Sequence, residues 1–174
     1  VLGQKKIAIP KTYIVVNTEN INKVVKGIGS LPLILKAVTG SHGSGVAIVE
    51  SLRGLRSVTA MMIGDSGSNP IIVQEYVKES KGKDVRVFIV GKKIVGVMER
   101  IAKKRGEFRS NFQLGGRVRV AELSRKEKDM AFSAVKACGL DIAGVDMLRT
   151  NKGPKILEVN ANPGLEGITQ ATGI

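Results

Sequence analysis

Several residue types that carry chemistry are scarce in this sequence of 174 residues. Cys138 is its one cysteine and His42 its one histidine, which excludes an internal disulfide and a zinc site built from Cys and His ligands. Tryptophan is missing and aromatic residues make up 3%, so the stacking platforms of single-strand binders are largely lacking. No apolar run approaches the roughly 20 residues of a transmembrane helix, and no signal-peptide pattern precedes the first predicted strand. We therefore expect a cytoplasmic protein that contacts no membrane.

Basic side chains are in clear excess. Lysine and arginine total 28 against 15 aspartate and glutamate residues, and the net charge of +13 favours anionic partners. Nucleotide phosphates, an acidic peptide and nucleic acid all suit this charge, and so does a basic surface that only faces solvent. The shortage of aromatic residues weighs against nucleic acid.

The pattern of apolar residues predicts an α+β protein with two lobes. Residues 1–77 form the first lobe in the order β-α-β-β-α-β, with strands 12–17, 31–38, 45–51 and 71–77 and helices 18–29 and 52–64. Residues 78–174 form the second, with a hairpin over 84–102, an irregular loop over 103–118, a helix over 125–138 and a hairpin over 143–159. SRKE, residues 124–127, is a capping box that starts this helix, and Gly139 ends it. The helix places Cys138 on its apolar face, so we expect this thiol in the core.

The last hairpin brings acidic side chains together. If its turn is centred on Lys152, Asp146 and Glu158 face each other with Cβ atoms roughly 4.5 to 5.5 Å apart. Asn160 points to the same side as Glu158, because strand side chains alternate. Two carboxylates and an amide oxygen form a partial oxygen shell suited to Mg²⁺ or Mn²⁺. Two alternatives remain open: the acids face solvent, or a one-residue bulge removes their direct pairing.

Lys36 interrupts the otherwise apolar strand LPLILKAV, a position that is costly for an ammonium group unless it meets an anion. The following TGSHGSG offers backbone N–H groups to phosphate oxygens, although it joins two strands and lacks the Lys-Ser/Thr of a P-loop. A flexible turn is the plain alternative.

Further polar residues stand near the predicted lobe boundary and in the irregular loop. Glu75 and Tyr76 end a predicted strand. Its backbone groups suit hydrogen bonds to the edge of an adenine ring, and the alternative is an ordinary strand end. Asp84 and Arg86 share one face of the next strand, and FRSN places Arg109, where a guanidinium can hold phosphate or carboxylate.

Five segments, in their order and spacing, resemble the ATP-grasp domain of RimK-like amino-acid ligases. They are LILKAVTGSHGSGV, IIVQEYVKESKGKDVRVFIVG, FRSNFQLGG, AGVDMLR and ILEVNANPGLEGI. The similarity extends from about residue 11 to residue 174. It implies an ATP-grasp fold of two α+β lobes with ATP bound between them. It also implies a preceding domain with a further ATP-contacting lysine, which we expect upstream of residue 1.

The resemblance assigns a role to each candidate residue. It implies that Lys36 contacts the phosphates of ATP, that Glu75 and Tyr76 line the adenine pocket, and that Asp84 meets the ribose. Phosphate or the reacting acyl group would be held by Arg109, Ser110 and Asn111. Mg²⁺ or Mn²⁺, with two ions expected, would be bound by Asp146, Glu158 and Asn160. Lys36 and Arg109 are the expected catalytic residues, and Arg86 is left without a role.

The function that this resemblance implies is an ATP-dependent carboxylate–amine ligase. A substrate carboxylate would form an acyl phosphate and ADP, and an amine would then form an amide. Glutamate is the favoured amino acid, added to a protein C-terminus or to a small acidic or carboxylate acceptor, and homo-oligomers are expected. The alternatives are a basic nucleic-acid-binding module and a nucleotide-binding domain without catalysis.

Overall fold

The computed structural model describes residues 1–38, 45–64, 69–103, 106–110 and 115–173, which form two compact units. The small unit is Pro10–Tyr76, and the large unit joins Val77–Ile174 to Val1–Ile9. The sequence predicted lobes of 1–77 and 78–174. The first residues are placed differently because their apolar side chains pack on the core of the large unit. None of the helices in the described ranges is long and apolar enough to cross a membrane.

The small unit is a four-stranded antiparallel sheet with two helices. Its elements are, in order, β1 (Thr12–Val15), α1 (Ile21–Ile28), β2 (Leu33–Ala37), β3 (Val46–Val49), α2 (Leu52–Ile63) and β4 (Ile71–Glu75). The strands lie in the order β1-β4-β2-β3, so β2 is an inner strand. The predicted β-α-β-β-α-β order is confirmed.

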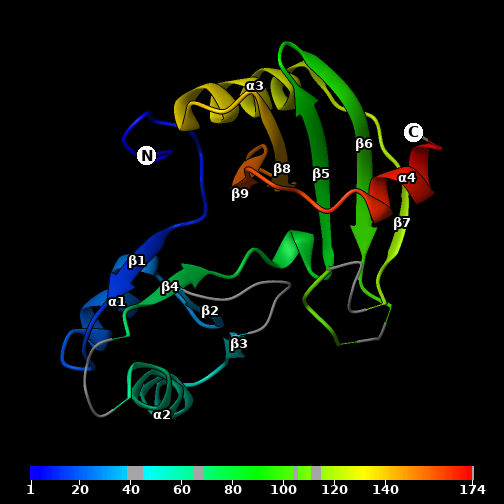
Figure 1. The fold of residues 1–174 in the computed structure, drawn as a ribbon. Helices are drawn as coiled ribbons and strands as arrows, with labels where there is room; N and C mark the ends of the chain where they lie inside the picture. The colour runs from blue at the N-terminus through cyan, green and yellow to red at the C-terminus, as the bar shows by residue number, and fades with distance from the viewer. Residues whose placement is uncertain (39–44, 65–68, 104–105, 111–114, 174) are drawn as a thin grey trace. The chain divides into compact units, whose positions relative to one another are not determined.

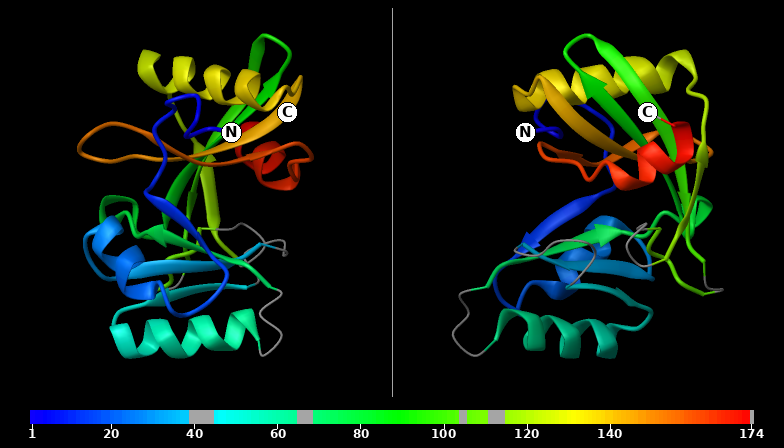
Figure 2. Two further views of the ribbon diagram at one scale, coloured as in Figure 1. Left: turned by 90° about the vertical axis from the view of Figure 1, so that its left-hand side faces the viewer. Right: turned by 45° about the vertical axis from the view of Figure 1, so that its right-hand side comes forward.

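Both helices of the small unit share a core with one face of its sheet; Figure 2 shows α2, in cyan to green, alongside the strands. From β2, Leu33 and Leu35 enter this core. Because side chains alternate along a strand, Lys36 is directed to the face that the helices leave uncovered. Ser51 begins α2 by accepting a hydrogen bond from the N–H of Gly54.

The large unit is a five-stranded antiparallel sheet in the order β7-β6-β5-β8-β9 (Figure 1). Its elements are η1 (Lys78–Ser80), β5 (Lys83–Val90), β6 (Lys93–Ile101), β7 (Arg117–Val120), α3 (Arg125–Cys138), β8 (Ile142–Leu148), β9 (Lys155–Asn160) and α4 (Glu166–Thr172). The central strand β5 pairs with both β6 and β8.

The two faces of the large sheet carry different side chains. Val85, Val87 and Ile89 of β5 pack with α3 in the apolar core. The alternate side chains Asp84 and Arg86 lie on the opposite face, as predicted. The helix α4 packs on β6 and β7. The side chain of Ile168 passes so close to Gly96 that a Cβ at Gly96 would lie 2.9 Å from it.

The capping box at the start of α3 is confirmed. The side chain of Ser124 accepts from the N–H of Glu127, and a Glu127 carboxylate oxygen accepts from the N–H of Ser124 over 2.8 Å. Gly139 ends the helix in the left-handed conformation, also as predicted. The prediction of a buried Cys138 is wrong, since this thiol is exposed. Cys138 is the last residue of the helix, one turn beyond Val135, where the buried stripe ends.

Three features of the large unit were not predicted. β7 lies within and after the segment interpreted as an irregular loop, and α4 follows a segment interpreted as a turn. The third is the N-terminal segment, which lies beside β9: the N–H of Ile156 donates to the carbonyl of Ala8 over 2.8 Å. This bond satisfies part of the otherwise open sheet edge.

Candidate metal and phosphate site

The two acids of the last hairpin lie directly opposite each other, as predicted, but the register has a different cause. Towards the turn, Met147 pairs with Ile156, one residue out of the predicted register. A bulge between Asp146 and Met147 leaves Leu157 unpaired and brings Glu158 opposite Asp146. A bulge was expected to remove the direct pairing of the two acids, but in the structure the bulge produces that pairing.

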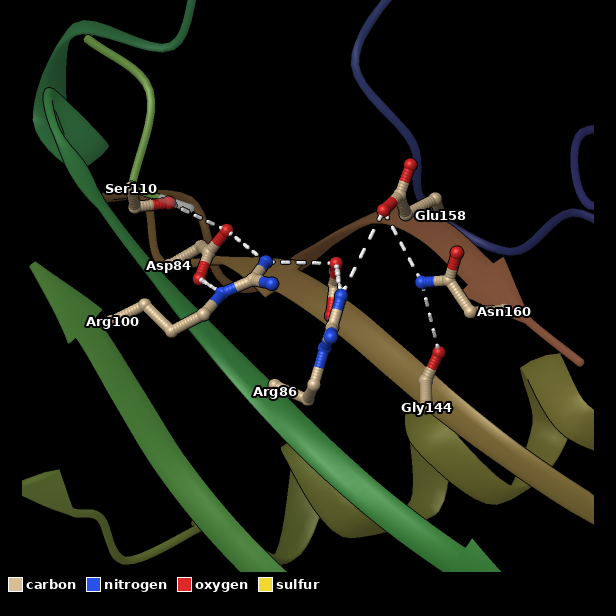
Figure 3. Close-up of polar contacts among 8 residues, drawn as sticks. Asp84, Arg86, Arg100, Ser110, Gly144, Glu158 and Asn160 are labelled. Carbon is tan, nitrogen blue, oxygen red and sulfur yellow. Dashed lines mark hydrogen bonds and ion pairs between the residues drawn. The ribbon is translucent and has the colours of Figure 1, made fainter. Parts of the chain in front are cut away.

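Arg86 of β5 holds the carboxylate of Asp146 with two parallel hydrogen bonds (Figure 3). Its Nε donates to Oδ1 over 2.6 Å and its Nη2 donates to Oδ2 over 2.7 Å. The two residues are directly paired across β5 and β8, which fixes this geometry through the sheet. The Nη2 atom also lies 4.0 Å from Glu158 Oε1. Arg86 thus faces both predicted metal-binding acids.

Arg100 of β6 connects two buried acids. Its Nε and Nη2 donate to the two carboxylate oxygens of Asp84, over 2.6 and 2.5 Å, and Nη2 also donates to Asp146 Oδ2 over 2.8 Å. Ser110 adds a hydrogen bond from its Oγ to Asp84 Oδ2 over 2.7 Å. Asp84 is 5% exposed, and both of its oxygens are used inside the unit. Its expected contact with ribose stays a prediction.

These contacts set the protonation of the cluster. Burial raises the pKa of Asp146, but hydrogen bonds from Arg86 and the charges of both guanidinium groups outweigh burial and hold that pKa below its usual value. Burial raises the pKa of Asp84 above its usual value, despite the hydrogen bonds from Arg100 and Ser110. The contacts of Asp146 therefore favour its ionised form, which is the form that binds a metal ion.

The donor atoms fit a divalent cation that prefers oxygen. Oδ2 of Asp146 accepts from two guanidinium groups, and Oδ1 accepts from one. Glu158 lies within hydrogen-bonding reach of Asp146, and Asn160 Nδ2 donates to Glu158 Oε1 over 3.2 Å. In the described ranges no group of three or more Asp, Glu, His or Cys side chains converges. A cation here would therefore depend on the Asn160 amide, together with water and phosphate oxygens.

Arg109 has an acidic partner two residues away. Its backbone N–H and its Nε donate to Glu107 Oε1 over 2.9 and 3.0 Å, and its Nη2 donates to Oε2 over 2.9 Å. The side-chain hydrogen bonds from Arg109 lower the pKa of Glu107 to about 2. The guanidinium also lies 5.7 Å from the ring centre of Phe108. Asn111 lies outside the described residues, as does most of the glycine-rich segment after Lys36.

The small unit contains the remaining candidates. Lys36 is half-buried on β2. Glu75 Oε2 accepts from the N–H of Lys11 over 3.0 Å, and the N–H of Glu75 donates to the Lys11 carbonyl. The Tyr76 hydroxyl is buried and has no hydrogen-bond partner among the described residues. Burial raises the pKa of Tyr76, and the charge of Glu50 adds to this shift.

Sequence reasoning missed Arg100 and Glu107. Arg100 could have been found by the pattern that identified Lys36, because it is a basic residue within a largely apolar strand, IVGVMERIA. Its opposition to Asp84 depends on a bulge between Phe88 and Ile89, which the sequence does not reveal. Glu107 had no signal beyond its nearness to Arg109.

The chain matches the family model of the RimK-like ATP-grasp domain over residues 1–174. It is 42% identical over 171 residues to a "Probable alpha-L-glutamate ligase" of Vibrio vulnificus, covering 98% of this chain and 56% of that protein. It is 44% identical over 173 residues to a "Probable alpha-L-glutamate ligase 1" of Shewanella baltica, covering 99% and 56%. The chain thus spans little more than half the length of these relatives.

Solved structures with the same fold are also ATP-grasp ligases. The ligase PsnB, complexed with a minimal precursor, Mg and ADP, superposes with a TM-score of 0.74 at 21% identity, covering 99% of this chain and 51% of that chain. D-alanine–D-alanine ligase from Bacillus anthracis superposes with a TM-score of 0.73 at 21% identity, covering 97% and 55%. At this identity the likeness concerns the fold, which is the predicted α+β ATP-grasp fold.

Proposed function

Because this chain belongs to the RimK-like ATP-grasp family, we propose that the whole protein is an ATP-dependent ligase that joins a carboxylate to an amine. The observation that carries the proposal is the family match over all 174 residues, with relatives at 42% and 44% identity named as glutamate ligases. The oxygen donors opposite each other on β8 and β9 support it.

The proposed reaction has two displacement steps. A carboxylate oxygen of the acceptor attacks the γ-phosphorus of ATP, the bond to the bridging oxygen breaks, and ADP leaves with an acyl phosphate formed. An amine nitrogen then attacks the acyl carbon, phosphate leaves with the bonding electrons, and the amine proton passes to solvent. Both steps require reactants to be positioned and charge to be neutralised more than they require a protein nucleophile.

Basic side chains would supply that neutralisation. In the small unit we assign Lys36 to the phosphates of ATP, and the Glu75 and Tyr76 segment to adenine. The orphaned Tyr76 hydroxyl supports a polar ligand nearby. In the large unit we assign Arg109 to the transferring phosphoryl or the acyl group, because a planar guanidinium pairs with such anions through two parallel hydrogen bonds.

Asp146, Glu158 and Asn160 would hold Mg²⁺ or Mn²⁺, with two ions expected. When bound, such an ion neutralises phosphate charge during the transfer. The chain's own contribution is to hold the oxygen donors in place: Arg86 and Arg100 fix the carboxylate of Asp146, and the strand pairing of β8 and β9 sets Glu158 opposite it.

Glutamate is the proposed amino acid, since the relatives are named glutamate ligases. The proposed acceptor is the C-terminus of a protein or a small carboxylate compound. An acidic acceptor would suit the net charge of +13.

ADP release by the whole protein, measured across a panel of amino acids and acceptors, tests this proposal. We expect ADP release that requires an amino acid and an acceptor, with a product heavier than the acceptor by one amino-acid residue in mass spectrometry. ADP release that no amino acid stimulates, with no ligated product, would contradict it.

A further inference from the structure

We propose that Arg100 is a positioning residue that couples the segment holding Arg109 to Asp146. The inference rests on the proposed function, because Asp146 matters here as a ligand of the proposed metal. The coupling runs through Ser110 and Asp84. It gives a common task to Arg100, which has no assigned role, and to the buried Asp84, whose contact with ribose stays a prediction.

The first support is an unbroken series of short hydrogen bonds within the large unit (Figure 3). Ser110 Oγ donates to Asp84 Oδ2 over 2.7 Å, Arg100 donates to both oxygens of Asp84, and the same Arg100 Nη2 donates to Asp146 Oδ2 over 2.8 Å. Because Nη2 donates to both acids, a shift of the Arg100 side chain changes its hydrogen bonds to both.

The second support is burial. Asp146 is 1% exposed, Arg100 4%, Asp84 5% and Ser110 6%. Water therefore has little access to replace a bond that breaks, and a lost partner leaves a buried charge uncompensated. The loss of one contact is therefore costly for the members that remain.

The third support is where the members are anchored. Asp84, Arg100 and Asp146 stand on the neighbouring strands β5, β6 and β8, which are paired in register. Ser110 alone comes from a segment outside regular structure, directly after Arg109. The strands therefore provide a fixed frame, and the hydrogen bond from Ser110 ties the phosphate-binding segment to that frame.

Thermodynamic coupling between two sites acts in both directions. If the position of Ser110 affects how Asp146 is held, a cation bound by Asp146 must in turn affect the segment around Ser110. The proposed metal and the proposed phosphate-binding arginine would then become ordered together, although the described contacts include no direct bond between Arg109 and Asp146.

The binding of Mn²⁺ to the whole protein tests this coupling. Electron paramagnetic resonance would count free Mn²⁺ in the presence of a non-hydrolysable ATP analogue. Arg100→Lys keeps the charge but loses the planar fork, and it should weaken Mn²⁺ binding about 10-fold or more, as outer-shell changes do. Ser110→Ala removes one hydrogen bond of the series and should weaken binding about threefold.

Ser80→Ala is the matched control. Ser80 is 8% exposed, lies in the same unit, and donates its Oγ to the carbonyl of Arg149 over 2.6 Å, outside the series. Ser80→Ala removes a buried hydrogen bond comparable to the one that Ser110→Ala removes. Ser80→Ala should therefore lower stability to a similar degree while leaving Mn²⁺ affinity unchanged.

Hydrogen exchange supplies a readout that needs no turnover. In the wild-type protein, Mn²⁺ with the analogue should slow amide exchange in residues 107–110, and this slowing should be lost in Ser110→Ala and kept in Ser80→Ala. Arg100→Lys should speed exchange in the same residues even without the ion.

Two results would overturn the coupling. If Ser110→Ala and Ser80→Ala give the same Mn²⁺ affinity and the same exchange in residues 107–110, Ser110 has only a structural role. Glu158→Gln alters a proposed metal ligand directly. If this variant leaves Mn²⁺ affinity unchanged, the proposed metal site is wrong, and so is the coupling that depends on it. The two failures are distinguished by the response of Glu158→Gln.

Discussion

At the scale of single residues, Asp146 and Glu158 differ in what they do for the fold. Asp146 is buried between the guanidinium groups of Arg86 and Arg100, whereas the side chain of Glu158 is 51% exposed. A buried charge that loses its partner is far more costly than an exposed one. The two proposed metal ligands should therefore respond differently to the loss of charge.

Asp146→Asn should destabilise the protein by about 3 to 5 kcal/mol, because it leaves two buried or half-buried guanidinium groups without full compensation. Glu158→Gln should change the free energy of unfolding by no more than about 0.5 kcal/mol. Urea denaturation of both variants measures this. Equal losses of stability would contradict the assigned burial of the charge network.

The Glu107 carboxyl should titrate with a midpoint at about 2, because its hydrogen bonds from Arg109 favour the ionised form. The unfolded chain titrates near 4.5, so this group stabilises the fold above that pH and loses its contribution as the pH falls through about 2. The carboxyl ¹³C shift of Glu107 in an NMR titration reports the midpoint. A midpoint near 4.5 would show that Arg109 is not held by this acid.

The sequence could predict the opposition of Asp146 and Glu158 but not its cause. Alternation along a strand and the position of a turn are readable from residue types, whereas no residue type marks the bulge at Leu157. The hydrogen bonds of Arg100 are hidden for the same reason. They depend on three strands coming together, and the residues concerned are far apart in the chain.

At the scale of elements, glycines allow the C-terminal segment to lie on the large sheet. A Cβ at Gly144 would come within 2.6 Å of Pro163, and one at Gly96 within 2.9 Å of Ile168. Both glycines lie on strands, β8 and β6, on the face away from α3. They create the space into which Pro163 and α4 fit.

Gly96→Ala should destabilise the protein by about 1 to 3 kcal/mol, since the added methyl group overlaps Ile168 in a packed contact. Gly164→Ala is the control, because a Cβ there meets nothing within 4 Å. Thermal unfolding compares the two, and hydrogen exchange over residues 166–172 should rise only in Gly96→Ala. Similar melting temperatures for both variants would contradict the packing of α4.

Most elements could be predicted because their signals are local. The apolar stripe and capping box of α3, and the β-branched runs of the hairpins, specify structure within a few residues. β7 reads RVRV, and this alternation of charged and apolar residues is such a signal, although it is short and follows a glycine-rich stretch. α4 reads EGITQAT, has Ile168 as its one large apolar residue, and packs against β6.

At the scale of the whole molecule, the net charge of +13 and the proposed metal site fit the same proposed ligand, a metal-bound nucleotide. A basic surface attracts phosphates without choosing among them. A cluster of oxygen donors, in contrast, repels phosphate unless a cation lies between them. Nucleic-acid binding would explain the charge but give the half-exposed Glu158 no role, whereas the proposed metal-bound nucleotide gives a role to both.

The magnesium dependence of ADP release by the whole protein tests the central claim most directly, with Glu158→Gln compared with Glu166→Gln. Both residues are exposed glutamates of the same C-terminal segment, but only Glu158 faces Asp146. We predict that Glu158→Gln lowers turnover, or raises the magnesium concentration needed for it, by about 10-fold or more, and that Glu166→Gln changes neither. Equal magnesium dependence in the two variants would contradict the assignment of Asp146, Glu158 and Asn160 as the metal site.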